Sequence, residues 1–102
     1  MASVLVSPRA RRNLQRLIQT HSLPASTVDR FVAAVAPLAD FPSIGAPLAG
    51  RWSGYRFILG PWRWMLIVYA YDENQGQVGV VTVQDARSAS AATRLEVTGE
   101  RP

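Results

Sequence analysis

The sequence predicts an α+β fold in which an N-terminal helical hairpin packs on one face of an antiparallel sheet. Two observations support this prediction. Apolar residues recur at helical spacing through about the first 40 residues, and from residue 51 onward aromatic and β-branched residues form three short runs separated by turns. The length of 102 residues and the 48% hydrophobic content indicate a single globular domain with one core.

The first half of the chain is expected to form a strand followed by two helices. Residues 2–6 are apolar and β-branched, as in a first strand. The Ser-Pro pair at 7–8 provides an N-cap and a first helical residue for a helix that should run to about Thr20. A second helix is expected with Ser26 as its N-cap, and Pro37 should kink or end its last turn. Because about five residues join the helices, an antiparallel helical hairpin is expected.

The second half is expected to form the rest of the sheet. Residues 40–50 hold two prolines and two glycines and are predicted to be a loop. Strands are expected at 52–59, 62–71 and 78–84, with Gly60-Pro61 as the turn of a hairpin. The segment 62–71 is apolar on both alternations, which predicts a central strand largely covered on both faces. The predicted order is β-α-α-β-β-β.

The domain and its boundaries follow from this order. Residues 1–88 are expected to form one domain, with the helical hairpin on one face of the sheet and the other face open to a partner. Residues 89–102 contain too few large apolar side chains to hold themselves against a core. They are expected to form a flexible C-terminal tail.

Basic charge is concentrated in the first half of the chain. The sequence has eleven arginines, no lysine and seven acidic residues. Residues 1–51 carry six arginines against two acids (+4), whereas 52–102 carry five against five. The excess lies mostly on the predicted first helix and suggests a polyanion or an acidic protein segment as partner. The alternative is that these arginines only form a solvent-exposed face of the helix and bind no partner. The residues concerned are Arg9, Arg11, Arg12 and Arg16.

Several kinds of site are excluded by composition. Without cysteine there is no disulfide, no catalytic thiolate and no cysteine-bound metal, and the single histidine excludes a two-histidine metal site within one chain. No metal and no small-molecule cofactor is expected. His21 is expected to be a surface or capping residue with no partner to orient it. The apolar run 64–70 is too short to cross a membrane, and the chain is expected to be cytoplasmic.

Arginines interleaved with aromatic residues are the remaining chemical signal. Arginine binds phosphate bidentately and stacks on aromatic rings, so the predicted strands that carry these residues could face RNA. The alternative is that the aromatic side chains only fill the strands and the arginines cover them. Because arginine stays protonated, proton transfer in a ribonuclease would need another group. The phenols are Tyr55, Tyr69 and Tyr71, each of which is equally explained as strand filling.

Five segments together resemble the RelE/ParE superfamily of toxins. The segment V-L-V-S-P-R-A-R-R-N-L-Q-R-L at 4–17 is similar to their first strand and helix, and L-A-D-F-P-S-I-G-A-P-L-A-G at 38–50 to their link into the sheet. The three strands that follow correspond to segments beginning at 54, 64 and 78. These segments are G-Y-R-F-I-L, W-M-L-I-V-Y-A-Y-D and V-G-V-V-T-V-Q-D-A-R. The resemblance covers about residues 2–88.

The resemblance implies the toxin of a type II toxin–antitoxin module, neutralised by a cognate antitoxin. RelE-like members cleave messenger RNA on the ribosome, whereas ParE-like members poison DNA gyrase. For RNA cleavage, the resemblance implies catalytic roles for Arg56, Arg63 and Arg87. Arg63 lies six residues before Tyr69, however, whereas the corresponding arginine and tyrosine of the family are three residues apart. In addition, no tyrosine or histidine follows Tyr71.

These departures favour ParE-like inhibition of gyrase. RNA cleavage is the first alternative, and a non-toxic scaffold that only binds the antitoxin is the second. Because antitoxin C-terminal segments in such systems tend to be acidic, Arg9, Arg12 and Arg16 are predicted to bind the antitoxin. An open sheet edge is predicted to accept a strand or helix from it.

Overall fold

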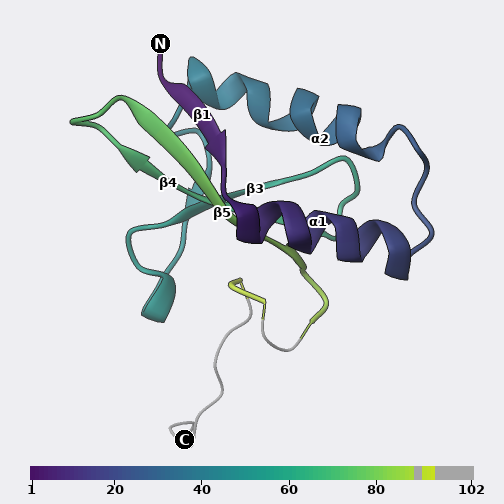
Figure 1. Ribbon diagram of the computed structural model, residues 1–102. Coiled ribbons are helices and arrows are strands. Elements are labelled where there is room, and N and C mark those ends of the chain that lie inside the picture. The colour runs from purple at the N-terminus through teal and green to yellow at the C-terminus, as the bar shows by residue number, and fades with distance from the viewer. Residues whose placement is uncertain (89–90, 94–102) are drawn as a thin grey trace, which may run out of the picture.

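The protein folds as two helices on a five-stranded sheet (Figure 1). The computed structural model describes residues 1–88 and 91–93. Both predicted helices and all four predicted strands are present, and the predicted loop adds a short strand and a 3-10 turn. The elements are β1 (Ser3–Val6), α1 (Pro8–Thr20), α2 (Thr27–Val35), η1 (Ala36–Ala39), β2 (Ala46–Pro47), η2 (Gly50–Trp52), β3 (Arg56–Leu59), β4 (Met65–Asp72) and β5 (Gln77–Asp85).

Helix α1 begins where the Ser-Pro pair predicts. The Ser7 Oγ accepts a hydrogen bond from the Ala10 backbone N–H (3.0 Å) and donates one to the Val81 carbonyl (3.2 Å). Ser7 therefore caps the helix and also ties its start to β5. One turn further on, the Asn13 side chain accepts a hydrogen bond from the Thr82 hydroxyl (2.6 Å). These bonds fix α1 along β5.

Helix α2 begins after Ser26, which is its N-cap residue as predicted. The Ser26 side chain makes no capping bond, however. Instead, the buried Thr27 hydroxyl donates to the Pro24 carbonyl (2.6 Å) and closes the turn before the helix. Pro37 acts as expected, because the last turn tightens into η1 around it.

The sheet is mixed, with the order β1-β5-β4-β3-β2. Strands β3, β4 and β5 pair antiparallel, as predicted, and the short β2 pairs antiparallel with β3, whereas β1 pairs parallel to β5. The prediction of a wholly antiparallel sheet was therefore wrong for β1. The reason is that the helical hairpin follows β1, and no tight turn fixes its direction relative to its neighbour.

The helical hairpin covers one face of the sheet, as predicted (Figure 1). Its side chains pack on alternate residues of β4 and on β5, which makes this face the main core. The fully or nearly fully buried members of this core are Ala10, Leu14, Phe31, Val35, Leu38, Met65, Ile67, Tyr69, Val78, Val80 and Val83.

The other face of the sheet is covered at its centre. Leu66 and Val68 are 1% and 0% exposed, which confirms that the central strand is covered on both faces. The prediction of an open second face was wrong there, because the segment around η2 folds back over it. The residues packed on this face include Leu48, Trp52, Tyr55 and Phe57.

The predicted tail, 89–102, lies mostly outside the described residues. Its described part, 91–93, includes two small apolar residues that contact the second face. Ala91 and Ala92 are 6% and 9% exposed and pack in the same cluster as Leu66 and Val68. The Ala92 backbone N–H also donates to the Gln84 side chain (2.7 Å).

Candidate functional site

A cluster of charged and aromatic side chains lies where the end of α1, the β3–β4 turn and the end of β5 meet (Figure 1). The pairing of Met65 with Asp85 brings the turn and the end of β5 together. We call this group the end cluster and define it as His21, Arg30, Trp62, Trp64, Asp85 and Arg87. Its members come from four segments of the chain: the end of α1, α2, the β3–β4 turn and the end of β5.

Asp85 organises the charged half of the end cluster. The Arg87 guanidinium makes two parallel bonds to this carboxylate, Nε to Oδ1 and Nη2 to Oδ2, both of 2.9 Å. The His21 Nε2 lies 3.4 Å from the Asp85 Oδ2. The side-chain hydrogen bond from Arg87 is the largest cause that lowers the pKa of Asp85 below its ordinary value. Asp85 is therefore an anion that faces the Arg87 guanidinium and the His21 imidazole.

Two tryptophans form the aromatic half of the end cluster. The rings of Trp62 and Trp64 lie 6.5 Å apart between centroids. The Arg30 guanidinium lies 5.7 Å from the Trp62 centroid, and the Arg87 guanidinium lies 5.0 Å from that of Trp64. The His21 ring lies 4.4 Å from Trp64. Each indole thus carries a cationic or ionisable group against it.

His21 is the C-cap residue of α1, in agreement with its expected capping position. The prediction that it has no orienting partner was wrong, because Asp85 lies beside it and Trp64 packs against its ring. The sequence contains no signal for this arrangement. His21 and Asp85 are 64 positions apart, and only the docking of α1 along β5 brings them together.

The three arginines predicted for RNA cleavage do not lie together. Arg87 belongs to the end cluster, and the exposed Arg63 lies in the adjacent turn. Arg56 pairs instead with Tyr69 on β4. Tyr69 lies four residues after Met65, so Arg56 is about 13 Å along the strand from the end where Arg87 lies. The Arg56 Nη1 donates to the carbonyls of Ser43 (3.2 Å) and Gly45 (2.7 Å). Arg56 therefore anchors the loop that precedes β2.

Tyr69 anchors the same loop from within the core. It is 0% exposed, and its hydroxyl donates to the Pro42 carbonyl (2.8 Å) and accepts from the Gly45 N–H (2.9 Å). Burial raises the pKa of Tyr69 above the ordinary 10.0. A buried phenol with both bonds made and a raised pKa is a structural group, which agrees with the strand-filling interpretation.

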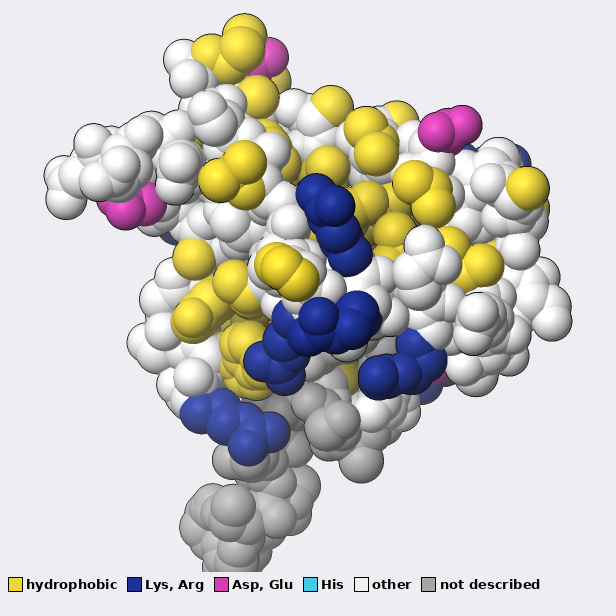
Figure 2. Space-filling view, in the orientation of Figure 1, with side chains coloured by type: hydrophobic (Ala, Val, Ile, Leu, Met, Phe, Trp, Pro, Cys, Tyr) yellow, Lys and Arg dark blue, Asp and Glu magenta, His cyan; other side chains and the backbone are white. Residues whose placement is uncertain are grey.

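The arginines predicted to bind an antitoxin lie on the outer side of α1. Arg9, Arg12 and Arg16 are all exposed. On α2, Val28 and Val32 are 43% and 55% exposed, one helical turn apart. Figure 2 shows basic side chains gathered over α1, with hydrophobic side chains beside them. The helical hairpin therefore presents a surface that is both basic and apolar.

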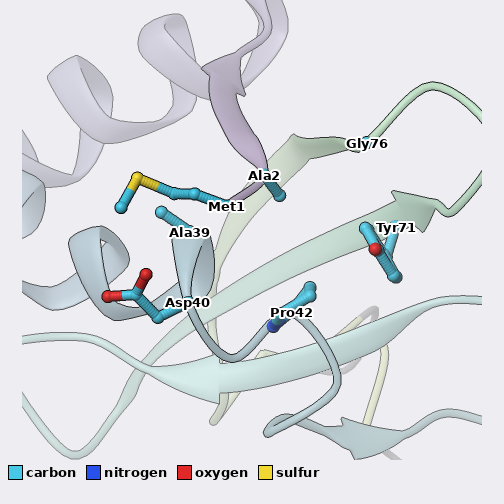
Figure 3. A pocket seen from close by; sticks show the side chains of 7 residues that line it. All are labelled: Met1, Ala2, Ala39, Asp40, Pro42, Tyr71 and Gly76. Carbon is cyan, nitrogen blue, oxygen red and sulfur yellow. The ribbon is translucent and has the colours of Figure 1, made fainter.

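A small recess lies between the start of β1, η1 and the β4–β5 turn (Figure 3). Asp40 and Tyr71 lie on opposite sides of this recess, with Pro42 between them. The recess therefore provides no converging pair of acid and base. Across residues 1–88 and 91–93, no three His, Asp or Glu side chains gather in a way that could hold a metal ion.

The fold is that of known toxins. The toxin–antitoxin complex RelBE2 of Mycobacterium tuberculosis contains a chain that is 24% identical, with a TM-score of 0.56 over 82% of this chain and 96% of that one. The Escherichia coli RelBE complex gives 15% identity and a TM-score of 0.62 over 86% and 100%. A metal-bound toxin from Helicobacter pylori is 16% identical, with a TM-score of 0.64 over 83% of this chain and 94% of that one. These likenesses define the class of fold.

The particular family is given by a match to residues 4–89. They match the model of the ParE toxin of type II toxin–antitoxin systems, so the chain belongs to this toxin family within the RelE/ParE superfamily. No curated protein matches the sequence. In the described part of the chain, neither helix is long and apolar enough to cross a membrane.

Proposed function

We propose that this toxin acts in the cytoplasm by binding and inhibiting DNA gyrase, as a ParE-like toxin. The separation of Arg56 from Arg63 and Arg87 is the observation that carries this proposal. RNA cleavage needs basic groups that converge on one phosphate and a group that moves a proton. Here Arg56 and Tyr69 are both engaged by the loop 42–45. The match to the ParE model supports the same conclusion.

We also propose that the cognate antitoxin covers the helical hairpin. Arg9, Arg12 and Arg16 would meet acidic residues of the antitoxin, while Val28 and Val32 would accept apolar ones. Such an interface combines the two features that this face presents. The strand β1, at one edge of the sheet, would offer the open edge for an added strand or helix of the antitoxin.

A supercoiling assay tests the proposed target. Relaxed plasmid, purified gyrase and ATP are mixed with increasing amounts of the toxin. We expect supercoiling to decrease with toxin and to recover when the antitoxin is added first. Full supercoiling at a large molar excess of folded toxin would rule gyrase out as the target.

A ribosome-dependent ribonuclease is the second candidate, and the end cluster is the observation that favours it. His21 beside Asp85 provides an ionisable pair, and the Arg87 guanidinium beside them could hold phosphate. In vitro translation followed by primer extension tests this candidate. Cleavage in the ribosomal A site that is lost in Arg87→Ala and His21→Gln would establish it. Intact message would exclude it.

The non-toxic scaffold makes a different prediction from both toxins. Induction without the antitoxin would then leave growth normal, although the protein still binds the antitoxin. Growth arrest on induction excludes the scaffold.

A further inference from the structure

We propose that the end cluster, together with Arg63, is the surface through which the toxin docks on an acidic patch of the protein that it inhibits. This inference rests on the proposed function, because it assumes that the target is a protein. It assigns to one end of the sheet a role distinct from that of the antitoxin-binding face of α1 and α2.

The charge of this surface fits an acidic protein partner. Arg30, Arg63 and Arg87 are exposed, and Asp85 is the one carboxylate that the end cluster contains. Three positive charges against one negative charge leave an excess of two. Such an excess steers an acidic surface toward this end of the molecule.

The residue types are those that dominate protein interfaces. Tryptophan and arginine are the most enriched residues among interface hot spots, and this surface holds two tryptophans and three arginines. Trp62 and Trp64 are only partly buried, so each contributes area to the core and to the surface. A partner that covers them would bury more aromatic area.

The side chains are also held in place before a partner binds. Arg87 is fixed by two bonds to Asp85 and by its contact with Trp64. Arg30 is held against Trp62. Ordering a free arginine on binding costs side-chain entropy, so this arrangement reduces the cost of docking.

The same contacts favour a protein partner over single-stranded RNA. Proteins that bind single strands stack bases on open aromatic rings. Here Arg30 lies against Trp62, and Arg87 and His21 lie against Trp64. A base would have to displace these groups, whereas a carboxylate can bind the exposed Arg30 guanidinium and leave its stack on Trp62 intact.

The test uses charge reversal away from the core. The variant Arg30→Glu with Arg63→Glu changes two exposed side chains of this surface, and Arg11→Glu with Arg51→Glu is a matched control elsewhere. Each is induced in cells without antitoxin, and growth is followed. Circular dichroism and a thermal melt confirm that both variants fold.

We expect the variant Arg30→Glu with Arg63→Glu to no longer arrest growth and the control variant to arrest it as the wild type does. For the purified variant, the concentration needed to inhibit gyrase should rise at least about 10-fold. Growth arrest at the wild-type level by the folded variant would overturn the inference. So would loss of A-site cleavage in the variant, which would make this an RNA surface.

The outcomes separate the two proposals. If the wild type arrests growth without inhibiting gyrase, the proposed target is wrong. Whether the variant arrests growth then still decides if the end cluster and Arg63 bind the target. If the wild type does not arrest growth at all, both proposals fail.

Discussion

At the scale of single residues, Tyr69 is the clearest case of a functional candidate with a structural role. As a strand tyrosine beside an arginine it could serve in RNA chemistry, but its hydroxyl is shared between Pro42 and Gly45. Removing that hydroxyl leaves the buried Gly45 N–H and the partly buried Pro42 carbonyl without their partner. The role of Tyr69 is therefore to hold the loop that leads into β2 and β3.

Tyr69→Phe should lower the free energy of unfolding by about 1–3 kcal/mol, because it leaves these two groups unpaired. Urea denaturation monitored by tryptophan fluorescence measures the change. Tyr71→Phe is the matched control, since Tyr71 lies two residues along the same strand at the edge of a recess. Equal midpoints for the two variants would contradict this role of Tyr69.

Tyr69 also predicts how stability depends on alkaline pH. Its pKa is raised in the folded protein, chiefly by burial, so the unfolded chain loses this proton first, near the ordinary value of 10.0. The stability that the protonated phenol contributes is complete below pH 10 and decreases as the pH rises through the folded pKa. Thermal melts between pH 8 and 11 on both proteins should show the advantage of wild type over Tyr69→Phe shrinking above about pH 10. A constant difference would refute this.

His21 shows why part of the candidate site could not be predicted from the sequence. A histidine near a helix end carries no information about which residue will face it. Its partner Asp85 and its neighbour Trp64 belong to strands that reach it only through the packing of α1 on β5. In contrast, the exposure of Arg9, Arg12 and Arg16 follows from helical periodicity alone, and these positions were predicted correctly as an outer face.

At the scale of elements, features that depend on residues close in the chain were predicted, whereas features that depend on contacts between distant segments were missed. The Ser-Pro start of α1 and the tightened turn at Pro37 depend on residues close in the chain. The parallel pairing of β1 and the covering of the second face depend on segments that meet only in the folded state. A sequence pattern cannot choose between the two directions of an edge strand.

The link between η1 and β3 depends on the close approach of Gly45 to β3 and β4. A Cβ built there would lie 2.6 Å from the Tyr69 hydroxyl oxygen and 2.7 Å from the Phe57 carbonyl oxygen. Gly45→Ala should therefore cost about 1–3 kcal/mol, because a backbone group must shift.

Gly79→Ala is the control for this substitution, since a Cβ at Gly79 meets nothing within 4 Å. Urea denaturation of both variants measures the difference. Similar stability of Gly45→Ala and Gly79→Ala would mean that the loop does not need the close approach.

Helix α1 carries the prediction about the antitoxin. Arg12→Glu with Arg16→Glu should weaken antitoxin binding about 10-fold or more at low salt, because attraction to acidic residues becomes repulsion. The difference should shrink as salt is raised. Isothermal titration at two salt concentrations measures it, with Arg51→Glu plus Arg63→Glu as the control outside α1. Unchanged affinity at low salt would exclude α1 as the docking surface.

At the scale of the whole molecule, the structure separates two surfaces. The helical hairpin presents a basic and partly apolar face (Figure 2), and the end of the sheet presents tryptophans bracketed by arginines. The charge excess first seen in composition belongs to the former. A toxin with separate surfaces for its antitoxin and its target can be altered at one of them without loss of the other.

The central claim is that this member of the ParE toxin family acts on gyrase and not on messenger RNA. The most direct measurement is the topology of a reporter plasmid extracted from cells soon after the toxin is induced without its antitoxin. We predict that the plasmid loses negative supercoiling, and that co-expression of the antitoxin prevents this loss. A plasmid that stays fully supercoiled in growth-arrested cells would contradict the claim.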